Sequence, residues 1–147
     1  MRRAGLAVYI HLAWATWDRL PLLRGDVERH IYRAIGAKCE ELGAEMVALG
    51  GVEDHIHLLV GLPTTLSIAD LVKHVKGASS HALNEQASSK DAFFKWQGAY
   101  GACSVSPEDL GKVTEYIKHQ RAHHAAGTLD PALEQSSADK KDREAGS

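Results

Sequence analysis

Apolar residues recur at strand spacing in some segments of the chain and at helical spacing in others. The order of these segments restricts the fold more than any other feature. Residues 6–16 carry apolar side chains at every second position, which predicts a strand with one core face. Residues 26–43 carry them at helical spacing and predict a helix. Residues 44–49 and 52–62 predict two more strands, joined by a tight turn at Gly50-Gly51 as in a hairpin.

The second half of the chain adds a helix, a strand and a last helix. Ser67, with Asp70 three residues later, marks a helix start, because both side chains can satisfy free backbone donors of the first turn. Residues 96–105 predict a fourth strand, and Ser106-Pro107-Glu108-Asp109 begins a helix that ends near Gly127. The order β-α-β-β-α-β predicts an α+β, ferredoxin-like fold, an antiparallel sheet with two helices on one face. The additional C-terminal helix can then cover the open face.

The charge distribution predicts one domain of residues 1–127 and a disordered polar tail of residues 128–147. The tail holds five acidic and three basic side chains, which account for the whole net charge of −2. The rest of the chain therefore has no net charge. This argues against a protein that binds duplex DNA through a large positive surface, although local basic patches can still bind nucleic acid. Cys39 and Cys103 fit no metal or disulfide spacing, and no segment has the length of a membrane span. We therefore expect a cytoplasmic protein with two reduced thiols.

Two histidines lie two positions apart in the third predicted strand. His55 and His57 should project from the same face, while Ile56, Leu58 and Val60 enter the core beneath the two helices. Two imidazoles at such positions can share one cation and leave it open positions, as a catalytic metal requires. The alternative is an exposed polar strand face. The apolar flank that follows the pair favours a covered one.

The last predicted helix places Tyr116 and Gln120 one above the other, because they are four residues apart. A neutral amide oxygen can complete a two-histidine site without adding negative charge, so the metal stays a strong Lewis acid. A tyrosine is a poor nucleophile at neutral pH and needs a nearby cation or a base. The candidates for that base are His123, His124 and Lys118. The alternative for Tyr116 is a rim aromatic with no chemical role.

Several motifs, in order and in register from about residue 8 to residue 124, resemble the small single-tyrosine HUH transposases of bacterial insertion sequences. They are HLAWAT (11–16), DHIHLLV (54–60), KGASS (76–80), WQGAY (96–100), SVS (104–106) and YIKHQ (116–120), followed by His123-His124. One position departs from the family pattern. The family usually has a basic residue directly after the first-strand threonine, whereas Trp17-Asp18 stand here before Arg19.

The resemblance implies a metal-dependent DNA transposase that cleaves and rejoins single-stranded DNA through a 5′-phosphotyrosine intermediate. By position it assigns Tyr116 as the nucleophile and His55, His57 and Gln120 as ligands of Mg²⁺ or Mn²⁺. It also implies a homodimer that binds single-stranded DNA hairpins at the ends of an element, without a nucleotide cofactor and without a membrane. Whether the tyrosine serves its own subunit or the partner's stays open.

Two other functions are consistent with the same residues. A domesticated relative would process hairpin repeats of the chromosome without moving itself. A non-catalytic module would bind single-stranded nucleic acid on its sheet, with the histidines as surface polar groups. For phosphate contacts, the best candidates lie on the polar sides of the two later helices: Lys73, Lys76, Lys112, Lys118 and Arg121.

Overall fold

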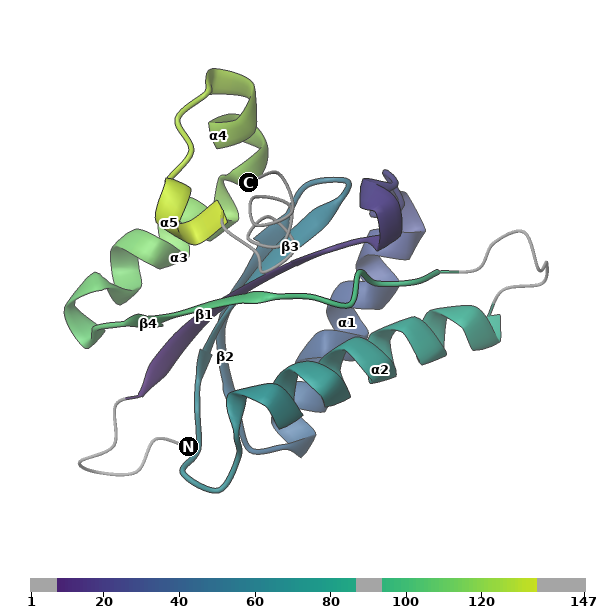
Figure 1. The fold of residues 1–147 in the computed structure, drawn as a ribbon, viewed down its shortest axis with the longest axis horizontal. Helices are drawn as coiled ribbons and strands as arrows, with labels where there is room; N and C mark the ends of the chain where they lie inside the picture. Colours follow the sequence, from purple (N-terminus) through teal and green to yellow (C-terminus); the bar gives the residue numbers. More distant parts are fainter. Residues whose placement is uncertain (1–7, 87–93, 135–147) are drawn as a thin grey trace, which may run out of the picture.

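The computed structural model describes residues 8–86 and 94–134 and forms two layers of helices around one sheet (Figure 1). The strands are β1 (Tyr9–Ala15), β2 (Glu45–Gly51), β3 (His55–Gly61) and β4 (Gly101–Val105). The helices are α1 (Gly25–Glu41), α2 (Ile68–Gln86), α3 (Leu110–Lys118), α4 (Gln120–Ala126) and α5 (Pro131–Glu134), with short 3-10 turns η1 (Trp17–Arg19) and η3 (Pro107–Asp109).

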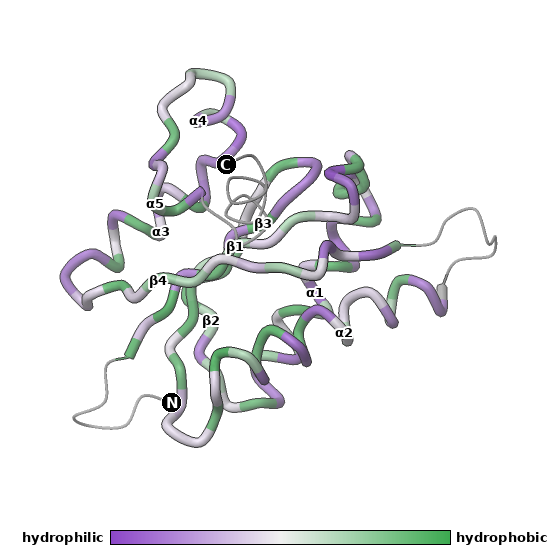
Figure 2. Tube along the Cα trace, in the orientation of Figure 1, coloured by the Kyte–Doolittle hydropathy of each residue, from purple (hydrophilic) through white to green (hydrophobic). Residues whose placement is uncertain are grey.

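The four strands form one antiparallel sheet in the order β2-β3-β1-β4. β1 and β3 therefore lie in the middle, and β2 and β4 form the edges. Helices α1 and α2 pack side by side on one face (Figure 1), and hydrophobic and hydrophilic residues alternate along both (Figure 2), as expected for helices with one face on a sheet. The predicted ferredoxin-like arrangement is confirmed.

The main core lies between the sheet and these two helices. Ile56, Leu58 and Val60 enter it from β3, as predicted. Its other buried members include Ile10, Leu12 and Trp14 of β1, Ile31 and Ile35 of α1, and Leu71 and Val75 of α2. None of the described helices is long and apolar enough to cross a membrane.

A second core fills the opposite face of the sheet. Leu59 of β3 packs there against Val113 and Ile117 of α3 and Leu133 of α5. The prediction that β1 has one core face is therefore wrong, because all seven of its residues are buried between the two helical layers. Residues 6 and 7 of the predicted strand lie outside the described residues.

The close approach of α3 to the sheet depends on Gly50 of β2. A Cβ atom at this position would lie 2.5 Å from the backbone oxygen of Ile117. Glycine therefore lets the last turn of α3 rest directly on the strand. That contact places the turn carrying Tyr116 over β2 and the neighbouring β3.

Other boundaries differ from the sequence prediction for local reasons. β4 begins at Gly101, and Trp96 forms an isolated bridge with Thr16 in place of a continuous strand. The predicted last helix breaks at His119, whose backbone leaves the helical region (φ −110°, ψ 30°). There the His119 ring Nδ1 lies 2.8 Å from the Glu115 carbonyl oxygen, so the side chain takes part in the capping of α3.

The tail predicted to be disordered from residue 128 contains α5. The Asp130 carboxylate accepts a hydrogen bond from the Ala132 N–H at 3.0 Å, and Pro131 begins the helix. Leu133 is buried in the second core, which anchors the segment. The prediction was wrong for residues 131–134, because it rested on composition and charge, and these averages do not register a single apolar anchor. Residues 135–147 lie outside the described residues.

Candidate active site on the second face of the sheet

The two histidines of β3 project to the face covered by α3, α4 and α5. His55 is 7% exposed and His57 is fully buried, with ring centroids 5.2 Å apart. The side chain of His55 is held from behind, because its Nδ1 lies 2.7 Å from Asp54 Oδ1. Its Nε2 is thereby directed into the site. The strand alternation that puts Ile56 in the main core thus puts both imidazoles on the other side.

Tyr116 and Gln120 reach the same place from the break between α3 and α4. Tyr116 lies in the last turn of α3, and its ring centroid is 6.0 Å from that of His57. Gln120 is the first residue of α4 and is 1% exposed. Its Oε1 lies 3.2 Å from His124 Nε2, and the rings of His124 and His55 are 4.9 Å apart. The structure therefore brings all four predicted site residues to one region within a single chain.

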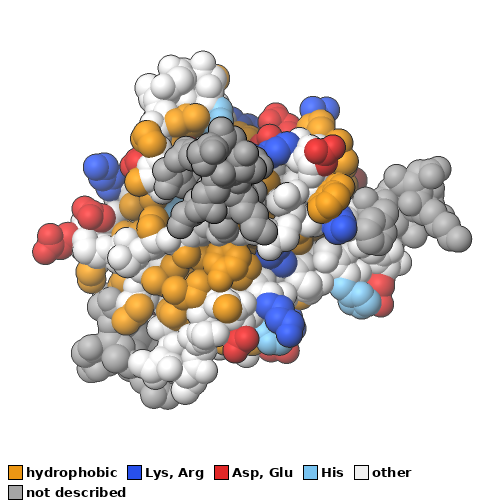
Figure 3. Space-filling model, viewed as in Figure 1, with side chains coloured by type: hydrophobic (Ala, Val, Ile, Leu, Met, Phe, Trp, Pro, Cys, Tyr) orange, Lys and Arg blue, Asp and Glu red, His pale blue; other side chains and the backbone are white. Residues whose placement is uncertain are grey.

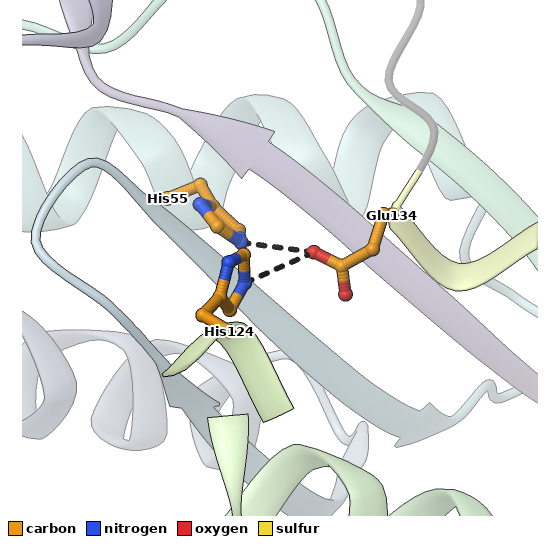
Figure 4. A group of neighbouring side chains, drawn as sticks. All are labelled: His55, His124 and Glu134. Atoms are coloured by element: carbon orange, nitrogen blue, oxygen red, sulfur yellow. Dashed lines mark hydrogen bonds and ion pairs between the residues drawn. The ribbon is translucent and has the colours of Figure 1, made fainter. Parts of the chain in front are cut away.

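Glu134 of α5 lies in the middle of this group and was missed by the sequence analysis. Its Oε1 is 3.1 Å from His55 Nε2 and 3.3 Å from His124 Nε2 (Figure 4). Its Oε2 is 3.2 Å from His57 Nε2 and accepts a hydrogen bond from the hydroxyl of Tyr116. A signal was present in the sequence, since Asp130-Pro131 followed by Leu133 has the form of a capped helix start with an apolar anchor.

The carboxylate and the imidazoles shift each other's pKa values. Burial alone would raise the pKa of Glu134, but the hydrogen bond from His55 and the close imidazole of His57 hold it well below its usual range. Burial lowers the pKa of His55, yet its hydrogen bonds to Glu134 and Asp54 outweigh that effect and leave it raised. Burial dominates at His57, so its pKa is lowered. The site therefore contains a carboxylate anion beside imidazoles of unequal basicity.

Tyr116 is held on several sides. The Asp130 backbone N–H donates to its hydroxyl oxygen at 3.0 Å, and its ring stacks on that of His123 at 4.7 Å between centroids. Burial and the hydrogen bond to Glu134 raise the pKa of the phenol to about 12. The hydroxyl is therefore protonated at neutral pH and needs an acceptor for its proton before it can attack. Of the three bases proposed from the sequence, His123 stacks on the ring, His124 contacts Glu134, and Lys118 is exposed.

The residues present fit a divalent metal ion. His55, His124 and Glu134 each offer a ligand atom, and these atoms lie within 4.8 Å of one another. His57 Nε2 is buried and has no hydrogen-bond partner, although a carboxylate oxygen lies 3.2 Å away outside hydrogen-bonding geometry. A buried ring nitrogen without a partner is unusual unless another group uses its lone pair. Imidazole nitrogens with carboxylate and amide oxygens form a donor set that Mn²⁺ and Mg²⁺ can share.

The basic residues proposed for phosphate contacts divide into two groups. Lys76 is half-buried and donates to the backbone oxygen of Gln97, and Arg121 pairs with Glu28 at 2.9 Å and Glu53 at 3.1 Å. For Lys76 the structure contradicts the prediction of a free phosphate ligand, because its ammonium group ties α2 to the segment before β4. Lys73, Lys112 and Lys118 are exposed. On the face shown in Figure 3, the Lys and Arg side chains are scattered among acidic ones.

Comparison with known proteins finds relatives of one kind. The family described as "Transposase IS200 like" matches residues 6–120. The transposase for insertion sequence element IS200 of Salmonella typhimurium is 28% identical over 116 residues, which cover 75% of this chain and 74% of the relative. The ISDra2 transposase TnpA of Deinococcus radiodurans is 29% identical over 117 residues, covering 75% of this chain and 81% of the relative.

Two solved structures share the fold. A crystal structure assigned to a transposase of Deinococcus radiodurans R1 has a TM-score of 0.62 and 27% identity, covering 82% of this chain and 96% of that one. A REP-associated tyrosine transposase bound to a REP hairpin has a TM-score of 0.63 and 16% identity, covering 84% of this chain and 72% of that one. The family match spans well over half of the chain. The chain therefore belongs to the IS200-like transposase family.

Proposed function

We propose that this protein is a metal-dependent transposase that cleaves and rejoins single-stranded DNA through a 5′-phosphotyrosine intermediate on Tyr116. The observation that carries the proposal is the position of the Tyr116 hydroxyl. It lies in one site with His55 and His57, joined to both imidazoles through the carboxylate of Glu134. A hydrolase that activates water would not need a phenol held at this point.

His55, His57 and Gln120 are the proposed ligands of Mg²⁺ or Mn²⁺, with His124 and Glu134 at the same place. When bound, the metal would act as a Lewis acid on a phosphate oxygen. The side chain of Gln120 supports this role, because it is buried and its oxygen is directed to His124, whose ring lies beside that of His55. The three proposed ligands are themselves neutral, so they do not reduce the polarising power of the ion as anionic ligands would.

The chemical step follows from the contacts of Tyr116. The phenol oxygen forms a bond to phosphorus, and the bond from phosphorus to the 3′-oxygen of the preceding nucleotide breaks. The phenol proton leaves along its hydrogen bond to Glu134 Oε2 and passes on to the imidazole of His124 beside that carboxylate, and the leaving 3′-oxygen takes up a proton to become a hydroxyl. Reversal of the same step on another strand end rejoins the DNA without a nucleotide cofactor.

The proposed DNA partner is a single-stranded hairpin at the end of an element. This rests on the family and on the fold shared with a protein whose structure contains a REP hairpin.

A homodimer is also proposed. The edge strands β2 and β4 expose backbone groups that need protection, and Met46 of β2 is 42% exposed. Sedimentation showing a monomer at micromolar concentration, both free and with hairpin DNA, would contradict the dimer. In the chain described, Tyr116 lies beside histidines of its own subunit.

The decisive experiment is a search for the covalent adduct. The full chain is incubated with Mg²⁺ or Mn²⁺ and a labelled single-stranded oligonucleotide that carries a hairpin, and the products are separated on a denaturing gel. A labelled protein band is expected with the native chain and with Tyr32→Phe, a control on α1 at the opposite face of the sheet. No band is expected with Tyr116→Phe. Cleavage that persists in Tyr116→Phe without an adduct would indicate hydrolysis instead. Hairpin binding with no cleavage by the native chain would favour a non-catalytic module.

A further inference from the structure

A line of hydrogen-bonding side chains crosses the sheet behind His57. His11 of β1 has its Nε2 2.8 Å from His57 Nδ1, and its Nδ1 is 3.7 Å from the sulfur of Cys103 on β4. The strand register produces this line. His11 is directly opposite Cys103, and it is diagonal to His57, which faces Ala13. One side chain from each of three adjacent strands therefore takes part.

Both histidines are neutral rings, because His11 is 2% exposed and His57 is fully buried in the sheet. A neutral imidazole carries one ring proton, so each ring has one donor and one acceptor nitrogen. The short contact between His11 Nε2 and His57 Nδ1 needs one proton between them. Either His57 donates to His11, or His11 donates to His57.

The two arrangements have different consequences for the site. If His57 Nδ1 donates, His57 Nε2 offers its lone pair to the site, and the proton of His11 lies on Nδ1, facing the Cys103 sulfur. If His11 Nε2 donates, the proton of His57 lies on Nε2. That atom is buried, and Glu134 Oε2, 3.2 Å away, lies outside hydrogen-bonding geometry, so the donor would be poorly satisfied. Donation from His57 avoids this poor contact, and it is the arrangement that a metal ion at His57 Nε2 requires, with His11 Nε2 as the acceptor at 2.8 Å.

We propose that His11, with Cys103 behind it, is a positioning residue that holds His57 in the tautomer whose Nε2 is free to bind the metal. This role rests on the proposed function, in which His57 is a metal ligand. It follows a general pattern, since a metal-binding histidine usually donates its other ring N–H to a neighbouring acceptor, which sets its tautomer and orientation. Here the acceptor is a second imidazole in place of the usual carboxylate or carbonyl group.

The tautomer can be observed without any activity measurement. Protein with ¹⁵N-labelled histidine is studied by long-range ¹H–¹⁵N correlation spectroscopy, first without metal and then with saturating Mg²⁺. The His57 resonances are assigned from the spectrum of His57→Gln. We expect a protonated Nδ1 and an unprotonated Nε2 for His57 in both spectra. A proton on Nε2 in the native protein would overturn the proposal.

Variants at His11 test whether the neighbour sets the tautomer. His11→Leu removes the acceptor, whereas His11→Gln retains a side-chain oxygen for the same bond. The affinity for Mn²⁺, measured by calorimetry, should fall by roughly 10- to 100-fold in His11→Leu and recover largely in His11→Gln. The exposed His81→Leu is the control and should bind as the native chain does. Unchanged affinity in folded His11→Leu would overturn the proposal. If His11→Leu does not fold, the spectrum of the native protein and the Mn²⁺ affinity of His11→Gln still test the proposal.

The outcomes also separate this proposal from the proposed function. A native chain that binds neither Mn²⁺ nor Mg²⁺ would remove the metal from the proposed function, while the metal-free spectrum would still report the tautomer of His57. A native chain that binds Mn²⁺ but carries the His57 proton on Nε2 would leave the metal site in place and remove the role of His11.

Discussion

The hydroxyl of Tyr116 donates a hydrogen bond to the carboxylate of Glu134 within one chain. The two residues come from different helices, α3 and α5, and a left-handed glycine, Gly127 (φ 70°), ends the helix between them. The same carboxylate contacts His55 and His57. The candidate nucleophile is thus coupled to the candidate metal ligands by a residue that lies after the part of the chain matched by the family.

Glu134→Gln should lower the pKa of Tyr116 from about 12 towards its ordinary value near 10. Burial raises this pKa, and so do the hydrogen bond to the carboxylate and its negative charge, which disfavours a phenolate. The substitution removes the charge and keeps the shape. The pKa of Tyr116 should fall because the negative charge that is removed had favoured the protonated phenol. NMR of tyrosine labelled at Cζ gives the titration, with the exposed Glu108→Gln as control. A Tyr116 pKa that stays near 12 would show that burial alone sets it.

The order of the elements could be predicted from the sequence, because strand and helix periods are local properties. The common face of His55 and His57 and the spacing of Tyr116 and Gln120 also follow from local geometry. The role of Glu134 could not be predicted in this way. It depends on the break at His119 and on one buried leucine, Leu133, which bring a charged segment back to the sheet.

The alternation in β1 predicted only one core face, although the predicted last helix could cover the other face of the sheet. Alternation identifies the more apolar face of a strand, but it cannot show that a later helix covers the other face as well. His11 is the clearest case. It lies on the less apolar face of β1, yet it is only 2% exposed, because α3 and α5 cover that face. Lys76 is a second case, because the backbone oxygens that it binds come from a segment with no regular pattern.

His55→Ala should abolish cleavage and adduct formation while the protein remains folded. The variant loses one proposed metal ligand and its contacts with Asp54 and Glu134. The loss of stability should be modest, about 1–3 kcal/mol, because the imidazole lies outside the main core but leaves partly buried partners behind. His81→Ala, at an exposed position of α2, is the matched control. Chemical denaturation measures stability, and the denaturing gel measures cleavage. Normal cleavage by His55→Ala would remove His55 from the metal site.

The salt dependence of hairpin binding should distinguish the helices that contact DNA. Lys118 belongs to α3, on the face of the sheet that carries the site, whereas Lys73 belongs to α2 on the opposite face. Lys118→Ala should reduce the slope of log affinity against log salt by about one, as expected when one phosphate contact is lost. Lys73→Ala should leave the slope unchanged. An equal effect of both variants would mean that DNA wraps around the molecule rather than lying over the site.

Gly50→Ala should reduce both stability and cleavage, because it changes the position of α3. The added methyl group would meet the backbone oxygen of Ile117 at 2.5 Å, and neither β2 nor the helix can yield by moving a side chain alone. Overpacking of this kind costs about 1–3 kcal/mol. The helix must move away from the sheet, and Tyr116, next to Ile117, moves with it. Gly111→Ala, in the same helix with nothing near its Cβ position, is the matched control and should stabilise the protein by up to about 1 kcal/mol. If Gly50→Ala keeps native cleavage at native stability, the contact between β2 and α3 does not position the tyrosine.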